Sequence, residues 1–296
     1  MNNESSFKLP PEVIKRLSLR SDARGLLQLG AHLGLLLLAG IALHHGFGSV
    51  WLLPALIVYA AILIMLFAPL HETIHFTAFQ TRWLNNLVAA PIGFLLLLPF
   101  QSFRLFHYQH HRHTQDPQRD PELLDMIPLT RSRYWWYLTG LPTWWQSLNA
   151  IRRHAGGRVD EPWIQPRHRE LVIREARLHL AGYALLLLLS LLLSSTVLWW
   201  YWVLPALIGQ PLLRLYLLPE HRGCDFSDRM LENSRTTYTM PPLNFLAWNM
   251  PYHAEHHYLA SIPFHALPAL HAYTGQRVKH RGDGYYRVNR EVYARA

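Results

Sequence analysis

The chain has 296 residues, of which 50% are hydrophobic and 16% are charged, against about 25% charged residues in an ordinary soluble domain. Its formal net charge is +9 and it has one cysteine, Cys224, which excludes an intrachain disulfide, a zinc ribbon and an iron–sulfur cluster. The apolar residues form long runs that Lys and Arg almost avoid. This pattern indicates a membrane protein, and anionic lipid explains the basic charge more simply than nucleic acid does.

The N-terminal part of the sequence predicts a tail and two membrane spans. Residues 1–24 are polar and lack the features of a secretory signal peptide. A span needs roughly 20 mostly apolar residues, and residues 25–43 and about 50–70 meet this requirement. Residues 86–100 are apolar but too short for a span, so we expect them to lie in the membrane interface or to re-enter the membrane.

The later part of the sequence predicts an interfacial segment and two more spans. Residues 134–148 contain four tryptophans, and tryptophan favours the headgroup zone. The apolar block at about 180–218 has nearly twice the length of one span. We therefore expect two spans there, about 180–197 and 199–218, joined by a tight turn near residues 194–197.

The distribution of Lys and Arg predicts the orientation of these spans. The short connections within each pair of spans lack both residue types, whereas the tail and the segments 71–179 and 219–296 are basic. By the positive-inside rule, both termini and these two segments face the cytoplasm. The predicted fold is thus an all-α membrane protein over residues 1–296. It has four transmembrane helices, interfacial helices and a cytoplasmic, histidine-rich metal-binding cap formed by residues 71–179 and 219–296.

Eight of the 19 histidines fall in three short motifs, HETIH, HYQHH and HAEHH. They are His71, His75, His107, His110, His111, His253, His256 and His257. Residues at i, i+3 and i+4 share one face of a helix, so each motif aligns its imidazoles. At 19 histidines in 296 residues, chance predicts roughly 0.08 HxxHH matches, whereas the chain has two. We therefore interpret the motifs as metal-binding, rather than as interfacial histidines that bind nothing.

The number of histidines indicates which metal the site holds. Imidazole suits zinc, copper, iron and nickel, so the ligand type alone does not decide. A catalytic zinc takes about three protein ligands, and eight histidines are too many for one such ion. They suit two adjacent ions, and two ions with open coordination positions suit O2 activation, which favours iron.

Two different classes of protein compete with this interpretation. HETIH also matches the HExxH signature of zinc metalloproteases, in which Glu72 would be the general base. That reading leaves both HxxHH motifs unexplained. A metal carrier or transporter should have ionisable residues within its spans. The predicted spans are nearly bare of them, with His32 and Arg214 as the exceptions.

From about Leu26 to His271 the sequence resembles the membrane fatty-acid desaturase and hydroxylase superfamily. The resemblance rests on HETIHFTAFQTRWLN, HYQHHRHTQDPQRDPE, PEHRGCD and NMPYHAEHH, set around four spans. It implies two iron ions (Fe2+/Fe3+) held by histidines, with O2 as co-substrate. It also implies oxidation of an unactivated aliphatic lipid or fatty-acyl chain, most readily desaturation. Hydroxylation and the oxidative decarboxylation of a fatty acid to a terminal alkene are alternatives within the class.

The resemblance extends the set of candidate site residues. In this superfamily a further histidine after the last span often completes the metal site, and His221 in PEHRGCD matches that place. We expect His113, His265 and His271 not to be ligands, and Arg235 to hold a loop or a substrate headgroup. The polar residues expected to orient imidazoles through their free N–H groups are Glu72, Asp116, Asp120, Glu220, Asp225, Asn249 and Glu255.

The sequence also predicts the partners. No haem-binding or flavin-binding segment is visible, so electrons should come from a separate donor such as a ferredoxin, a cytochrome or a reductase. The donor would dock on the basic cytoplasmic face. We expect the substrate lipid and the membrane lipids as further partners, and no nucleic acid.

Overall fold

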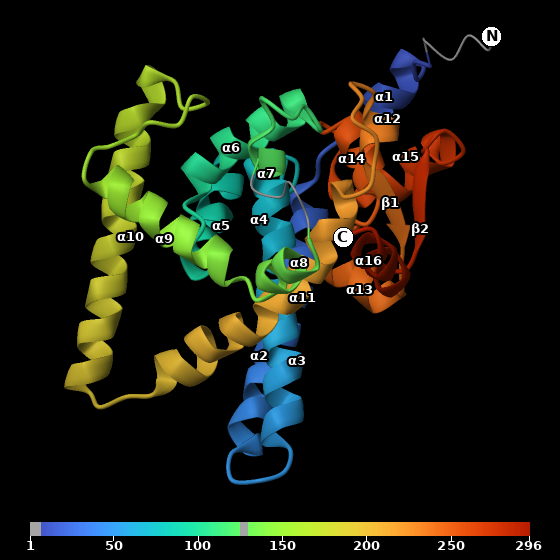
Figure 1. Cartoon of the computed structure of the whole chain (residues 1–296). Helices are drawn as coiled ribbons and strands as arrows, with labels where there is room; N and C mark the ends of the chain where they lie inside the picture. Colours follow the sequence, from blue (N-terminus) through green and yellow to red (C-terminus); the bar gives the residue numbers. More distant parts are fainter. Residues whose placement is uncertain (1–6, 125–129) are drawn as a thin grey trace.

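The computed structural model describes residues 7–124 and 130–296, and these parts of the chain are predominantly helical, with very little sheet (Figure 1). The first half contains the helices α1 (Pro11–Leu17), α2 (Asp22–Gly46), α3 (Leu52–Ile64), α4 (Phe67–Ile74), α5 (Arg82–Leu95), α6 (Phe100–His113), α7 (Pro121–Leu124), α8 (Arg131–Leu138) and α9 (Leu141–Ala155). The second half contains α10 (Pro166–Leu192), the π-helical turn η1 (Trp199–Val203), α11 (Leu204–His221), α12 (Met230–Asn233), β1 (Arg235–Tyr238), α13 (Pro241–Leu246), α14 (His253–Tyr258), the 3₁₀ turn η2 (Phe264–Ala266), α15 (Leu267–Thr274), β2 (His280–Asp283) and α16 (Tyr285–Ala294).

Four helical segments of the described chain are long and apolar enough to cross a membrane, as the sequence predicts. They are Asp22–Gly46, Leu52–Ile74, Pro166–Leu192 and Trp199–His221. Three of them agree with the predicted spans to within a few residues. The third begins at Pro166 instead of about residue 180, because the helix continues through an arginine-rich stretch ahead of its apolar part.

The second and fourth spans form the centre of the helical assembly. Of their most apolar stretches, 56% and 44% are buried, against 17% in the first and third spans, so α2 and α10 face outward. Helix α3 packs against both α2 and α11. Close approach to α11 depends on Gly209, where an added Cβ would lie 2.7 Å from Cβ of Ile64. Small residues allow such contacts between membrane helices.

The short apolar segment at residues 86–100 does not cross as a straight span. Helices α5 and α6 are bent by 99° at the break between them. Leu97 has a positive φ of 59°, and Pro99, which has no backbone N–H, precedes the start of α6. The bend places α6 against α4, so the second histidine motif lies beside the first.

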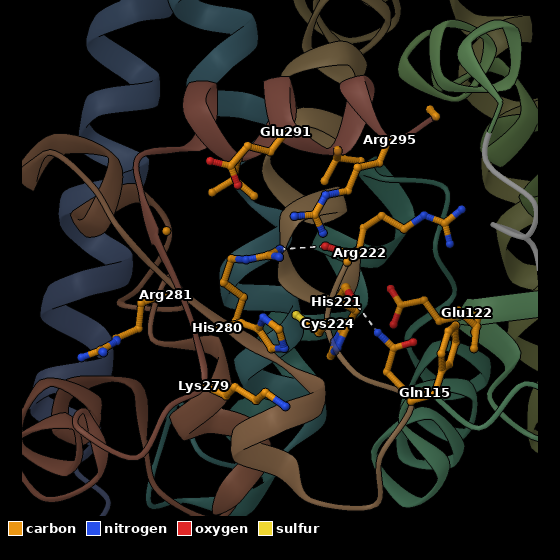
Figure 2. A pocket seen from close by; sticks show the side chains of 18 of the residues that line it. Gln115, Glu122, His221, Arg222, Cys224, Lys279, His280, Arg281, Glu291 and Arg295 are labelled. Atoms are coloured by element: carbon orange, nitrogen blue, oxygen red, sulfur yellow. Dashed lines mark hydrogen bonds between the residues drawn. The ribbon is translucent and has the colours of Figure 1, made fainter.

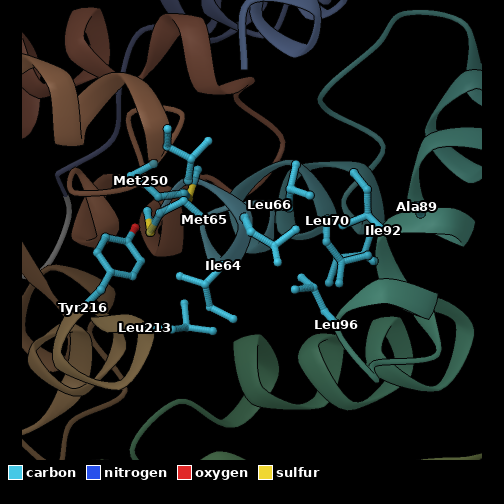
Figure 3. Close-up of a cluster of buried hydrophobic side chains, with 14 of the residues drawn as sticks. Ile64, Met65, Leu66, Leu70, Ala89, Ile92, Leu96, Leu213, Tyr216 and Met250 are labelled. Carbon is cyan, nitrogen blue, oxygen red and sulfur yellow. The ribbon is translucent and has the colours of Figure 1, made fainter. Parts of the chain in front are cut away.

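A hydrophobic core supports the end of α4 that carries the first histidine motif (Figure 3). Its members include residues of α3, α4, α5 and α11, and Ile64, Leu66 and Leu70 are each at most 1% exposed. Leu70 directly precedes His71 in the chain. Because protein interiors are closely packed, this core fixes the position of the histidine-bearing turn.

The C-terminal part of the cap, which follows α11, folds around a small parallel sheet. Strands β1 and β2 pair with Arg235 opposite His280, and β1 contacts both α11 and α14. Figure 1 shows this part of the cap at the upper right, whereas the turn between α2 and α3 lies at the opposite, lower end. The third histidine motif on α14 therefore meets the ends of the second and fourth spans.

Candidate metal centre

Nine histidines from four separate segments meet in one cluster. His71 and His75 come from α4 and its C-terminal end, three from α6, one from the last residue of α11, and three from α14. The others are His107, His110, His111, His221, His253, His256 and His257. Six of the nine side chains are no more than 5% exposed, so most of the imidazoles have lost their contact with water.

Helical periodicity explains how each segment presents several imidazoles at once. On α6, residues 107, 110 and 111 stand at i, i+3 and i+4, and on α14 residues 253, 256 and 257 repeat this spacing. Nε2 of His107 lies 3.0 Å from Nε2 of His111. The latter atom lies 3.1 Å from Nε2 of His256, so α6 and α14 meet through their histidines.

The cluster has two groups of possible ligand atoms. The first group is His71, His75, His107, His111 and His256, and the second is His110, His221 and His257, with the ligand atoms of each group within 4.8 Å of one another. His253 is in neither group, but its Nε2 lies 2.9 Å from Nε2 of His221. Ring contacts join the two groups, since the rings of His111 and His257 stack at 4.1 Å.

The ring nitrogens of the cluster suit metal ions. Buried nitrogens without a hydrogen-bond partner in the described chain include both of His71, Nε2 of His75 and of His257, and Nδ1 of His256. Leaving a buried polar atom unpaired costs roughly 1–3 kcal/mol. Burial and the neighbouring imidazoles hold the pKa of His256 and His257 well below the usual range. These imidazoles are therefore neutral and have lone pairs available for a metal ion.

Carboxylates lie beside His110 of the second group and beside His253, which adjoins that group. Oδ1 of Asp120 lies 2.9 Å from Nδ1 of His110, and Oε1 of Glu220 lies 3.4 Å from Nδ1 of His253. Burial acts to raise the pKa of Asp120, but the hydrogen bond from His110 and two backbone amides lowers it overall. A carboxylate behind a ligating histidine is the usual way to fix its orientation and tautomer.

Several orienting groups are ones that the sequence did not single out. The hydroxyl of Thr114 lies 3.2 Å from Nδ1 of His257, and Nδ1 of His221 donates to the backbone carbonyl of Asn233. Glu122 was not singled out either, but it differs from these groups: its Oε2 lies 3.0 Å from Nε2 of His110, the nitrogen that remains for a metal ion because Asp120 contacts Nδ1. Thr114 could have been found from the sequence, because it stands four residues after His110, on the same face of the helix. The carbonyl of Asn233 could not, because it lies 12 residues after His221 and no sequence pattern marks it.

The remaining predicted orienting residues contact other groups. Glu72 accepts from the Thr77 hydroxyl at 2.8 Å and from the backbone N–H of Phe264 at 3.2 Å. Glu255 binds Thr236, Thr274 and His271, which ties α14 to β1 and α15. Asp116 pairs with Arg119, Asp225 pairs with Lys279 and His280, and Asn249 donates to the carbonyl of Phe264.

The three histidines not expected to be ligands lie outside the two groups. Nδ1 of His265 is 3.1 Å from the guanidinium of Arg24, and Nδ1 of His271 is 2.6 Å from Glu255. The backbone carbonyl of His113 accepts from the N–H of Asp116. His265 is therefore a suitable control for mutations within the cluster.

Two side chains hold the backbone at His221. The guanidinium of Arg235, 8% exposed, donates to the carbonyls of Pro219 and Arg222, on either side of His221. The side-chain amide of Gln115 donates to the carbonyl of His221 itself at 2.5 Å, as Figure 2 shows. The interpretation that Arg235 holds a loop agrees with these contacts.

In the described part of the chain, two cavities are lined by histidines of the cluster, and a third shares wall residues with one of them. A small one of about 30 Å³ touches His71, His107 and His253. It shares the wall residues Phe67, Phe103, Glu122 and Leu217 with a larger, mostly apolar cavity of about 520 Å³ between α6, α9 and α11. A polar cavity of about 610 Å³ reaches His110 and His221 from the other side (Figure 2). The apolar cavity suits an alkyl chain, and the polar cavity is lined by Arg, Lys and acidic residues.

The fold and the cluster define a multi-span helical membrane protein with a polyhistidine site able to hold metal ions. The sequence matches the fatty acid desaturase family over residues 49–289, and the chain belongs to this family. It is similar to the sn-1 oleoyl-lipid 12-desaturase of Picosynechococcus sp., with 30% identity over 143 residues, 43% of this chain and 40% of the relative.

A second relative comes from a eukaryote. The chain is similar to the sphingolipid delta(4)-desaturase/C4-monooxygenase DES2 of Mus musculus, with 27% identity over 210 residues. This match covers 68% of the chain and 58% of the relative. The chain thus spans less than two thirds of the length of either relative.

Proposed function

We propose that the protein is a membrane-bound oxidoreductase that uses two iron ions, O2 and two electrons to oxidise an aliphatic lipid or fatty-acyl chain. Desaturation is the leading outcome. The observation that carries the proposal is the convergence of nine imidazoles, most of them buried, beside a small cavity that shares wall residues with a larger apolar one. Membership of the desaturase family and the two desaturase relatives support it.

The two groups of histidines would each hold one ion. His71, His75, His107, His111 and His256 form one ligand set. His110, His221 and His257, with His253 alongside, form the other. All donors are imidazole nitrogens, a ligand type that suits iron. Two sets within one cluster agree with a pair of ions better than with one zinc ion and three protein ligands.

The chain's own residues position the substrate and keep its reacting part dry. A diiron centre, when bound, supplies the oxidising power needed to remove hydrogen from an unactivated C–H bond. Desaturation converts a CH2–CH2 unit, O2, two electrons and two protons into a CH=CH unit and two waters. Phe67, Phe103 and Leu217 line both the small and the large cavity. They would hold the alkyl chain against the histidines and exclude water.

Hydroxylation is the second outcome that an observation favours. It begins from the same C–H bond, and it gives C–OH and one water from the same O2, electrons and protons. The mouse relative is named for both a desaturase and a C4-monooxygenase activity. Oxidative decarboxylation remains an alternative of the same class.

The structure does not favour the zinc protease alternative. The carboxylate of Glu72 is 0% exposed and one of its oxygens is engaged by Thr77 and the backbone of Phe264. A general base must lie within hydrogen-bond reach of the water that it activates. His71 and His75 also share their group with three histidines from the other motifs.

We further propose that the cluster and both termini face the cytoplasm and that a separate protein delivers the electrons. The second and fourth spans both end at the cluster, as four spans with cytoplasmic termini require. The donor would dock at the polar cavity, whose lining includes Lys279, Arg281 and Arg295 and reaches His221. Basic groups at this mouth would attract an acidic donor.

Elemental analysis of the purified protein tests the proposal. We expect close to two irons per chain, fewer in His221→Ala, and an unchanged content in His265→Ala, which lies outside the cluster. Mass spectrometry of lipids from cells with and without the protein should show a product two hydrogens lighter. One tightly held zinc, with activity that survives iron chelation, would refute the diiron assignment.

A further inference from the structure

Arg214 is a buried cation in the fourth span that the proposed metal chemistry does not use. It is 7% exposed on α11, and its Nε has no hydrogen-bond partner in the described chain. An ionisable residue within a span is costly, and such residues usually serve a functional site. His32, the other ionisable residue noted in the spans, differs, because its ring contacts the carbonyl of Ile62 and the indole N–H of Trp248.

The surroundings of Arg214 contain hydroxyl groups rather than a paired carboxylate. Its guanidinium donates to the Thr143 hydroxyl over a long 3.5 Å and also hydrogen-bonds to Tyr137. Within residues 7–124 and 130–296, no carboxylate forms an ion pair with it. Keeping a cation buried without an anionic partner costs free energy that a bound anion would recover.

Arg214 lines the large apolar cavity, in which the carboxylates of the described residues already have contacts. Glu161 binds Arg153 at 2.6 Å and His154 at 3.0 Å. Glu122 lies at the cluster end of the cavity, 3.0 Å from His110. A ligand entering this cavity therefore meets apolar walls and one cation without a carboxylate.

The path from Arg214 to the cluster follows one face of α11. Arg214, Leu217 and His221 stand at i, i+3 and i+7, and Leu217 also lines the small cavity beside His71 and His107. Seven residues of α-helix rise by about 10 Å. A group bound at Arg214 would thus be about two helical turns from the second group of histidines.

We propose that Arg214 binds the anionic head of the lipid substrate, a carboxylate or a phosphate. The alkyl chain runs from there past Leu217 to the histidine cluster, so the carbons that react lie about two helical turns from the head. The guanidinium supplies charge-assisted hydrogen bonds, and the hydroxyls of Thr143 and Tyr137 add neutral ones. This inference rests on the proposed function, because the bound lipid is taken to be the molecule that is oxidised.

Competition binding to the purified full-length protein tests the site. Labelled hexadecanoate is displaced by hexadecanoate, hexadecyl phosphate or hexadecanol, which share one chain and differ in the head. The wild-type protein should prefer at least one anion over the alcohol by roughly ten- to hundredfold, the effect of one charge-assisted contact. Preference for hexadecanoate alone assigns a carboxylate head, and preference for hexadecyl phosphate assigns a phosphate head.

Three variants separate the role of Arg214 from general effects of charge. Arg214→Gln should abolish the preference. Arg214→Lys retains the charge and should keep most of the preference, and it provides the test if the glutamine variant does not fold. Arg153→Gln removes the same charge from the same cavity, but from a cation already bound to Glu161, and should keep the preference. Equal binding of the three heads by the wild type would overturn the proposal. So would an unchanged preference in Arg214→Gln or an equal loss in Arg153→Gln.

Binding is measured with iron-loaded and with iron-depleted protein, so that the two proposals fail separately. The preference for an anionic head depends on Arg214 and should persist after iron is removed. A wild-type protein that binds two irons but shows no preference for an anionic head refutes the headgroup site alone. A protein that keeps the preference but binds no iron refutes the diiron assignment alone.

Discussion

Replacing Arg235 by methionine should weaken the metal site through the backbone of His221. The guanidinium of Arg235 serves two carbonyl groups, those of Pro219 and Arg222. Methionine fills similar space but donates no hydrogen bond, so both carbonyls lose their charged partner. His221 lies between them, and its own side chain donates to the carbonyl of Asn233, two residues before Arg235.

The magnitude follows from the two lost hydrogen bonds. A hydrogen bond to a charged group contributes roughly 1.5–3 kcal/mol, and Arg235 is 8% exposed, so solvent compensates little. We expect the variant to lose roughly 3–5 kcal/mol of stability, counted as two such bonds with some relaxation. In a chain of this size, that corresponds to a midpoint of thermal unfolding lowered by roughly 5–15 °C.

Thermal unfolding and iron content, measured on the same preparations, check this reasoning. Arg281→Met is the matched control, because Arg281 lies on the neighbouring strand and is exposed. The control should unfold like the wild type and hold two irons, whereas Arg235→Met should unfold earlier and hold less iron. Equal unfolding midpoints, or a destabilised Arg235→Met that still holds two irons, would show that Arg235 does not position His221.

Two further predictions concern topology and the first motif. Single cysteines are introduced in a Cys224→Ser background at the exposed positions Arg112, Tyr286 and Val50. Those at Arg112 and Tyr286 should be labelled from the cytoplasm and the one at Val50 from the other side. Labelling at Arg112 and Tyr286 from opposite sides would contradict the four-span orientation. Glu72→Gln should keep bound iron and measurable oxidation, because the amide oxygen still accepts from Thr77. Complete loss of activity with folding and metal content intact would instead support the protease alternative.

The predicted features that the structure reproduces depend on local sequence. Spans follow from the length of apolar runs, and the alignment of imidazoles on α6 and α14 follows from helical spacing. The break between α5 and α6 also had a local signal in Pro99, although its 99° angle did not. The third span extends to Pro166 because polar residues can continue a helix outside the bilayer, which hydropathy does not detect.

The features that the sequence did not reveal depend on contacts between distant segments. Acidic residues near the motifs look equivalent in sequence, yet Glu220 lies beside His253 while Glu255, two residues after His253, binds Thr236, Thr274 and His271. The difference arises because the first is on α11 and the second faces away from the cluster on α14. Which carboxylate approaches an imidazole is decided by how these helices pack, and one sequence carries no record of that packing.

The position of the cluster ties metal binding to the folding of the cap. The second span ends at His71 and His75 and the fourth at His221, whereas α6 and α14, which each carry three histidines of the cluster, belong to other segments of the chain. Without metal, this arrangement leaves several buried ring nitrogens without partners, each at a cost of roughly 1–3 kcal/mol. Metal ions that bind these nitrogens would remove the cost and join segments that otherwise share few strong contacts. The same ions would then hold α6 and α14 together, so metal binding at the proposed site would also stabilise the fold around it.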